Sequence, residues 1–514
     1  MWFQFSRNLK DMFRTNTPEE VIRSKPDNTP IRIVHTIRHP PAQQIGLDHW
    51  MQRVLTELDS ASASLAPDPV HDLRVAIRRC RSIAEGFTGI DSDRTWKKMR
   101  KAGKQIFVPL GRLRDSQVMI DWLNKLGSPD DPATKDLSAE LAKEEQELKI
   151  SALTALGNFD RKQWKSWIEV LSKRSRRVEI GGPAFEYMAL ERWHIAYALH
   201  QKALKNRSKV AYHSSRIGLK KFRYIVELFL PALYREWSAD LKEMQDLLGE
   251  VHDLDVLWDM ALKSGLVVDP EVRSRWQTKI AREREQRIAR YRQKMVGKTS
   301  LWKVWRQGLP SGKQREQALL AKFKIWAWSF DGDREHSRNV ARIALQLHDG
   351  FVKKGILRFA HANSRGLLHA AALAHEVGRS ETRKSYQKVS GRLIGQVDTP
   401  VGWDSEDVDI LAAVTRYHRG ALPRRSRDGL SQMSSQNQST CVQLAGILRL
   451  ADALEFCCQG KPTRVSVEKT SETALVYAAG YNAHSRLAEK VAAARHLLEV
   501  SCRAPIVIRA WNNS

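Results

Sequence analysis

The stretch HDLRVAIRRCRSI, residues 71–83, places one histidine and four arginines within thirteen positions. At a rotation of about 100° per residue, His71, Arg74, Arg78 and Arg81 fall in a helical stripe about 80° wide, and Arg79 lies outside it. Apolar residues occupy another side of the same helix: Leu73, Ile77 and Ala84. The pattern predicts a helix that is anchored in a bundle by one face and carries a row of positive charge above it.

The same pattern occurs a second time. HSSRIGLKKFRYIVELF begins at His213, 142 positions after His71 (213 minus 71). Its stripe contains His213, Arg216, Lys220 and Arg223, and Lys221 lies outside. Each copy is followed by a related segment, LGRLRDSQVMIDW from residue 110 and LGEVHDLDVLWD from residue 248, an offset of 138 (248 minus 110). Two matches in the same order predict two similar helical halves with pseudo-twofold symmetry.

Two interpretations of the basic stripes compete. A single basic helix face is usually solvated surface, and this interpretation holds for the outliers Arg79 and Lys221. Aligned cations repel each other by a few tenths of a kcal/mol per pair, which a polyanion would offset. Arginine suits that role because its planar guanidinium binds phosphate oxygens through two parallel hydrogen bonds. The repetition favours anion binding, and a basic row extends the first copy: Lys97, Lys101 and Lys104.

Composition agrees with an anionic partner. The chain of 514 residues has 85 Lys and Arg against 58 Asp and Glu, a formal net charge of +27, which favours nucleic acid, an acidic membrane or another polyanion. The N-terminus is too charged for a signal peptide, and no apolar run is long enough to span a membrane. An odd number of cysteines without a signal sequence predicts reduced thiols in the cytoplasm: Cys80, Cys441, Cys457, Cys458 and Cys502.

The chain divides into four parts by composition and periodicity. Residues 1–44 are expected to form a tail, residues 45–300 a helical bundle, residues 301–316 a linker and residues 317–514 a second domain. Three alternating stretches, RVSVE, ALVYAA and PIVIRAW, predict a small antiparallel sheet near the C-terminus. The predicted fold class is mainly α, a pseudo-twofold helical bundle followed by a helical domain with this sheet.

Residues 45–300 resemble the CHAD domain, the conserved histidine α-helical domain, in the repeated His-x-x-Arg-x-x-x-(Arg/Lys)-(Arg/Lys) pattern and the segments that follow it. The resemblance implies an antiparallel helical bundle that binds inorganic polyphosphate in a basic groove and carries no catalytic residue. Transferred to this sequence, the motif implies these binding residues: His71, Arg74, Arg78, Arg79, His213, Arg216, Lys220 and Lys221. The helical stripes add Arg81 and Arg223.

The second domain contains an ordered set of potential metal ligands: His336, His375 followed by Glu376, and Asp452. Their order resembles that of HD-type phosphohydrolases, so the domain is expected to be HD-like. Two imidazoles and two carboxylates can hold a divalent cation, the only cofactor that the sequence indicates. HSRNVARIALQL, LLHAAALAHEVGRS, RYHRG and LRLADALEF, within about 330–460, more specifically resemble the C-terminal domain of the exopolyphosphatase/guanosine pentaphosphate phosphatase family.

Two departures favour a degenerate site. The usual His-Asp dyad is His375-Glu376 here, and the family's histidine-containing stretch has no histidine near Tyr386. The family's actin-like catalytic domain, with its Gly-rich phosphate loops, has no counterpart in this sequence, so exopolyphosphatase activity is not expected. Alternatively, His375 is a hydrogen-bonded core histidine, and Asp452 pairs with Arg449 on its own helix.

Three further residues of this region, Arg416, His418 and Arg419, could contact phosphates instead and form a second anion surface. The vicinal Cys457 and Cys458 could indicate redox chemistry, but a role as small buried side chains is favoured.

The sequence therefore predicts a cytoplasmic polyphosphate-binding protein whose HD-like part is a non-catalytic module, and polyphosphate granules are a candidate location. That module could dock an exopolyphosphatase or a polyphosphate kinase. The main alternative is a metal-dependent HD-type phosphohydrolase that acts on polyphosphate or a nucleotide. Nucleic acid is disfavoured as the partner because the basic stripes lack interleaved aromatic residues for base stacking.

Overall fold

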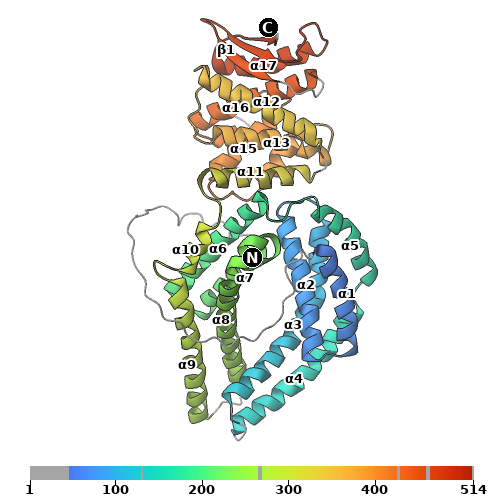
Figure 1. The fold of residues 1–514 in the computed structure, drawn as a ribbon, viewed down its shortest axis with the longest axis vertical. Helices are drawn as coiled ribbons and strands as arrows, with labels where there is room; N and C mark the ends of the chain where they lie inside the picture. Colours follow the sequence, from blue (N-terminus) through green and yellow to red (C-terminus); the bar gives the residue numbers. More distant parts are fainter. Residues whose placement is uncertain are drawn as a thin grey trace. The chain divides into compact units, whose positions relative to one another are not determined.

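The computed structural model describes residues 46–128, 131–263, 269–330, 332–424, 429–458 and 464–511. The expected tail, residues 1–44, lies outside this range. The described chain is mainly helical, with a small sheet near its C-terminal end, which confirms the predicted fold class (Figure 1). Within the described ranges, every helix is too short or too polar to cross a membrane.

The first region consists of two halves with the same order of packed helices. The first half contains α1 (Leu47–Ala63), α2 (Pro67–Thr88), α3 (Thr95–Leu126), α4 (Pro132–Gly157) and α5 (Arg161–Ser175). The second contains α6 (Pro183–Asn206), α7 (Lys209–Phe229), α8 (Pro231–Lys263), α9 (Pro270–Met295) and α10 (Leu301–Gln307). In each half, the first four helices pack consecutively and the fifth contacts the first, and the halves meet where α2 contacts α7 and α3 contacts α8.

Local sequence explains where several of these helices begin. Proline, whose missing N–H costs nothing in the first helical turn, opens α2, α4, α6, α8 and α9. Side-chain oxygens accept hydrogen bonds from first-turn N–H groups elsewhere: Asp160 caps α5, Ser208 caps α7 and Asp269 caps α9. Helix ends are therefore set by local chemistry, and the apolar faces decide which helices pack together.

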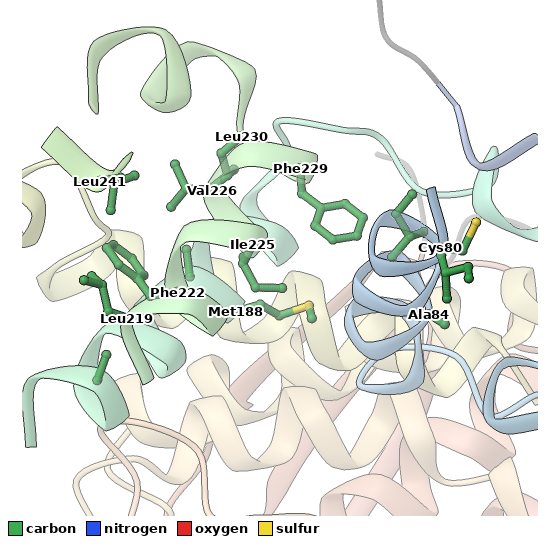
Figure 2. Close-up of a cluster of buried hydrophobic side chains, with 14 of the residues drawn as sticks. Cys80, Ala84, Met188, Leu219, Phe222, Ile225, Val226, Phe229, Leu230 and Leu241 are labelled. Atoms are coloured by element: carbon green, nitrogen blue, oxygen red, sulfur yellow. The ribbon is translucent and has the colours of Figure 1, made fainter. Parts of the chain in front are cut away.

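A dense aromatic core joins the two halves. Phe229 of α7 stacks on Phe185 of α6 with ring centroids 4.2 Å apart, and it meets Phe87 of α2 edge-to-face at 5.7 Å. Gly86 of α2 permits this approach, because a Cβ there would lie 2.7 Å from Cε2 of Phe229. Figure 2 shows Phe229 directed toward the helix that carries Cys80 and Ala84. This packing fixes α2 against α7.

The expected linker is largely helical. Residues 301–307 form α10, and Trp302 and Trp305 are buried in the core of the first region beside Trp193 and Phe222. Only four residues separate the end of α10 from the start of α11 (Gly312–Trp328). Gly308, Pro310 and Ser311 mark the short turn between these helices, and Ser300 directly precedes α10. These residues predicted a connection, but they did not reveal that Trp302 and Trp305 are buried. The domain limits themselves stay a prediction.

The C-terminal region is a helical cluster with a three-stranded sheet. Its helices are α12 (Arg334–Lys353), α13 (Ser364–Ala374), η2 (Val377–Ser380), α14 (Tyr386–Gly395), α15 (Ser405–Tyr417), η3 (Leu430–Gln432), α16 (Ser435–Cys457) and α17 (Ala488–Cys502). The strands are β1 (Val465–Lys469), β2 (Ala474–Ala478) and β3 (Ile506–Ala510), in the order β1-β2-β3. All five cysteines are free thiols, and Cys457 and Cys458 are buried.

The sheet differs from the prediction in one pairing. β1 and β2 are antiparallel, with Val467 opposite Val476, as the alternating stretches predicted. β3 pairs parallel to β2, with Val476 opposite Ile508. The reason is the helix α17, which lies between β2 and β3. It carries the chain back to the end of the sheet at which β2 begins, so β3 runs in the same direction as β2.

Candidate anion-binding cleft and a second cluster of ligating side chains

Basic side chains from both repeat helices line one cleft. Arg78 of α2 faces Arg216 and Lys220 of α7 across a space of about 290 Å³. The contact between α2 and α7 brings the two stripes together, since each helix buries its apolar face in the shared core. The rows therefore converge instead of pointing to opposite sides of the molecule.

The converging charges repel each other strongly. Burial lowers the pKa of Lys220 to about 7, and repulsion from Arg216, Arg78 and then Arg74 adds to the shift. Burial likewise lowers the pKa of Arg74 to about 10, although Asp115 opposes the shift. Because cations from both helices contribute to the shift of Lys220, the cleft is a single electrostatic unit.

The far wall of the cleft is acidic. α8 contributes Asp246, Glu250 and Asp253, which follow one another on one helix face. Burial raises the pKa of Asp253 to about 6, opposed by Arg216 and reinforced by repulsion from Asp115. Asp115 and Asp253 occupy the same position in the two repeated LG segments. These two carboxylates, for which the sequence pattern indicated no role, partly neutralise the cleft.

The two repeat histidines differ in their surroundings. Nδ1 of His213 lies 3.2 Å from Nδ1 of His252, within hydrogen-bond distance. Burial lowers the pKa of His252 to about 4, and Arg216 adds to the shift. His71 is exposed, and partial burial with the charges of Arg78 and Arg114 lowers its pKa too. All three imidazoles are therefore mainly neutral at pH 7 and can donate one N–H.

The two residues outside the stripes form a reciprocal pair of salt bridges. Arg79 of α2 pairs with Glu227 of α7. Lys221 of α7 pairs with Glu85 of α2, with Nζ 3.2 Å from Oε1. Both the cations and the carboxylates are related by the repeat offset of 142. Because of the symmetry, each half forms an equivalent salt bridge to the other half.

The remaining stripe residues have diverse partners. The guanidinium groups of Arg74 and Arg81 both lie over the ring of Phe107, each 4.7 Å from its centroid. Nη1 of Arg74 also donates to the backbone oxygen of Phe107 at 3.3 Å. Arg223 lies 3.5 Å from Glu227. The row on α3 is exposed and does not line the cleft: Lys97, Lys101 and Lys104.

A second cluster lies in the C-terminal region, where α12, the end of α13 and α16 meet. Nε2 of His336 lies 3.2 Å from Nε2 of His375, 3.3 Å from Oδ1 of Asp452 and 3.8 Å from Oε1 of Glu376. One ligand atom from each of His336, His375 and Glu376 lies within 4.8 Å of the others. The four residues singled out from the sequence therefore converge.

Backbone contacts set the tautomers of the buried histidines. Nδ1 of His375 donates to the carbonyl of Ala372 at 2.8 Å, and Nδ1 of His418 donates to the carbonyl of Thr415 at 2.6 Å. Each ring is fully enclosed, and Nε2 of His418 is buried with no hydrogen-bond partner in the described part of the chain. Both Nε2 atoms consequently carry a lone pair, the state that binds a metal ion.

Two regions of the chain match known protein families. Residues 47–262 match the CHAD domain, and residues 321–492 match the Ppx/GppA phosphatase, domain III. The chain contains a CHAD domain. Among solved structures, it is similar to the crystal structure of the CHAD domain from the plant Ricinus communis, with 19% sequence identity and a TM-score of 0.36 over 51% of this chain and 88% of that one. Together the family matches indicate a polyphosphate-related function.

The residues that the sequence predicted to bind polyphosphate together fall into two groups in the structure. Within the CHAD domain, Arg78, Arg216 and Lys220 share the cleft, whereas Arg79 and Lys221 form the ion pairs between the halves. The prediction that Arg79 and Lys221 belong to solvated surface is wrong. The sequence could not show this, because it does not reveal which carboxylates lie across the interface between the halves.

In the domain III region, two alternatives from the sequence do not hold. Arg449 donates to the backbone oxygens of Tyr417, Gly420 and Ala421, so Asp452 turns toward the histidines instead of pairing with it. His418 is 1% exposed and cannot belong to a surface that contacts phosphates. Arg416 and Arg419 line separate clefts.

The neighbouring Arg78 and Arg79 provide a matched test of these roles. We expect Arg79→Met to lower the free energy of unfolding by about 1–3 kcal/mol, since it leaves the buried Glu227 carboxylate without its cross-half partner. Arg78→Met should not destabilise the unliganded protein, because it removes one of several mutually repelling cations. Urea denaturation of both variants measures the difference, and equal losses of stability would contradict this division.

Proposed function

We propose that the CHAD domain binds inorganic polyphosphate in the cleft between α2 and α7. The observation that carries the proposal is the convergence of Arg78, Arg216 and Lys220 from both repeats on one cleft. Half-buried cations that repel each other are costly in the unliganded protein, and a polyanion supplies the missing countercharge. Arginine forks and the lysine ammonium would donate charge-assisted hydrogen bonds to the phosphate oxygens.

The other predicted binding residues would support binding from positions beside the cleft. Arg74 and Arg81 are held over Phe107 beside the cleft, and the exposed row on α3 would extend the track for a longer chain. His71 and His213 would each donate one N–H. Arg79 and Lys221, which pair with carboxylates of the opposite half, would act by fixing the distance between the two basic helices. Arg223 pairs with Glu227 of its own helix and would hold that carboxylate in place.

The C-terminal region is proposed to be an HD-like accessory module. Its match to domain III of a phosphatase family, without the Gly-rich phosphate loops of a catalytic domain in the sequence, supports a role in binding over a role in catalysis. The module could dock an exopolyphosphatase or a polyphosphate kinase. The protein would then act in the cytoplasm, at polyphosphate granules or with the enzymes that build and degrade the polymer.

Removing the three cleft cations should abolish tight binding. We expect Arg78→Ala/Arg216→Ala/Lys220→Ala to weaken polyphosphate binding at least about a hundredfold, because each charge-assisted hydrogen bond contributes about 1.5–3 kcal/mol. Isothermal titration calorimetry with long-chain polyphosphate at fixed salt measures the change. The slope of log affinity against log salt should also become shallower, by analogy with counterion release from nucleic acids.

The control variant replaces three exposed lysines of α5, Lys162, Lys165 and Lys173, by alanine. It changes the net charge equally but leaves the cleft intact, so its affinity should stay close to that of the wild type. Equal weakening in both variants would show that binding depends only on total charge. RNA that displaces polyphosphate at equal phosphate concentration would favour nucleic acid as the ligand.

Acidification should strengthen binding. Lys220, with a pKa of about 7, gains its charge as the pH falls from 8 to 6, and Asp253, with a pKa of about 6, begins to lose its charge. Both changes make the cleft more positive. If the ligand requires the protonated lysine, affinity should rise about tenfold over this interval. Lys220→Arg, which stays charged throughout, should flatten most of the profile, and an unchanged pH profile would contradict the assignment.

A second candidate function is metal-dependent phosphoester hydrolysis at the cluster of His336, His375 and Asp452. The favouring observation is that His375 has its Nε2 lone pair directed into a buried cluster of carboxylates, and Glu455 orients His336 through its Nδ1 at 2.7 Å. These residues fit a divalent cation, with Glu376 as a further oxygen ligand. A bound cation would polarise phosphate oxygens or activate a water molecule.

Metal content and phosphate release test this second candidate together. Purified wild-type protein should retain about one equivalent of a divalent transition metal after dialysis, and His375→Ala should lose it, as measured by plasma mass spectrometry. Phosphate released from polyphosphate or a nucleotide by the wild type, but not by His375→Ala, would make the protein an enzyme. Metal retention without phosphate release would leave the cluster a structural site, and the absence of both would reject it.

A further inference from the structure

An arginine-rich pocket opens beside the second cluster. It has a volume of about 790 Å³ and is lined by residues from two separate segments, residues 379–387 and residues 419–420. Three of its side chains are exposed arginines: Arg379, Arg383 and Arg419. We call this the arginine pocket. It is distinct from the CHAD cleft, with which it shares no residue.

Tyr386 forms the floor that holds two of the arginines in place. The guanidinium of Arg379 lies over the tyrosine ring, 4.7 Å from its centroid. Nη1 of Arg419 donates to the Tyr386 hydroxyl at 3.2 Å. Tyr386 itself is only 6% exposed, and its hydroxyl lies 3.5 Å from Oε1 of Glu376. Two guanidinium groups are therefore positioned before any ligand arrives.

The charge of this pocket is less compensated than that of the CHAD cleft. Its described lining residues include three arginines and no carboxylate, whereas the CHAD cleft has an acidic wall. The nearest carboxylate contact is that of the buried Glu376, whose Oε1 lies 2.5 Å from Nη2 of Arg379. Arg383 and Arg419 are thus available as donors to an anion.

Tyr386 separates the arginine pocket from the buried His418. His418 is 1% exposed, its ring lies 5.8 Å from that of Tyr386, and its Nε2 is buried with no hydrogen-bond partner in the described chain. A buried unsatisfied nitrogen calls for an explanation. The His418 ring lies 5.0 Å from that of His375, so this nitrogen belongs to the His336 cluster and does not line the arginine pocket. The pocket and the His336 cluster are therefore linked through Tyr386 and His418.

We propose that the arginine pocket binds a terminal phosphate group. Such a group presents three oxygens and close to two negative charges, whereas a phosphate inside a polyphosphate chain presents two oxygens and one charge. The guanidinium forks of Arg383 and Arg419 can donate to several of these oxygens at once. The Tyr386 hydroxyl donates to Glu376 and accepts from Arg419, so it holds that arginine in place without contacting the phosphate. The match to the CHAD domain favours the end of a polyphosphate molecule as the ligand. A nucleoside monophosphate offers the same phosphate chemistry from another source.

Tripolyphosphate, which consists mostly of ends, is the probe for this site. The experiment uses the full chain carrying the three cleft substitutions Arg78→Ala/Arg216→Ala/Lys220→Ala, so that the CHAD cleft does not contribute. Isothermal titration calorimetry should show residual tripolyphosphate binding, and Arg383→Ala/Arg419→Ala in this background should weaken it at least tenfold. Arg379 is left unchanged because it pairs with Glu376.

The matched control is Arg358→Ala/Arg486→Ala, two exposed arginines of the same region that do not line the pocket. This control should bind like its parent, and Arg383→Lys/Arg419→Lys should bind with intermediate affinity, since lysine keeps the charge but not the fork. Circular dichroism establishes that each variant is folded.

Three outcomes would overturn the proposal: no tripolyphosphate binding in the cleft-substituted chain, equal weakening by the control pair, or tighter binding of long polyphosphate than of tripolyphosphate at equal phosphate concentration. Tighter binding of adenosine monophosphate than of tripolyphosphate would identify a nucleotide as the source of the terminal phosphate. The cleft proposal fails separately, if the three cleft substitutions leave the affinity of the otherwise wild-type chain for long polyphosphate unchanged.

Discussion

Repulsion among cations is the constraint around which the first region is built. Arg78, Arg216 and Lys220 are held in one half-buried cleft, where burial and mutual repulsion reduce the basicity of the lysine. Two features oppose the repulsion: the aromatic core around Phe229, and the reciprocal salt bridges that join α2 to α7. The fold stores an electrostatic cost at one place, and a polyanion that binds there would release it.

Helical periodicity predicted the basic stripes and the duplicated halves because both depend on sequence spacing alone. The same spacing identified Arg79 as an outlier but could not reveal its partner, since Glu227 lies 148 positions away and is brought near only by packing between the halves. The acidic wall was missed for a related reason. The sequence does not distinguish Asp253 from the other acidic residues, because only the packing of α8 places it in the same cleft as Arg216.

In the C-terminal region, the sequence predicted which side chains come together but not what surrounds them. The order of His336, His375, Glu376 and Asp452 predicted their convergence, because that order resembles the ligand order of HD-type phosphohydrolases. What the sequence could not supply was the environment: His375 and His418 take their tautomers from backbone carbonyls, and Arg449 is diverted from Asp452 by three backbone oxygens. The substitution of Glu for Asp at position 376 leaves its carboxylate within reach of His336.

The most direct test of the central claim is urea denaturation of wild-type protein and Lys220→Met, with and without polyphosphate. Methionine fills a similar volume without the charge that Arg216 and Arg78 repel. The account predicts that Lys220→Met is more stable than the wild type when unliganded, and that polyphosphate raises the free energy of unfolding of the wild type by the larger amount. A less stable unliganded variant that polyphosphate stabilises as much as the wild type would contradict it.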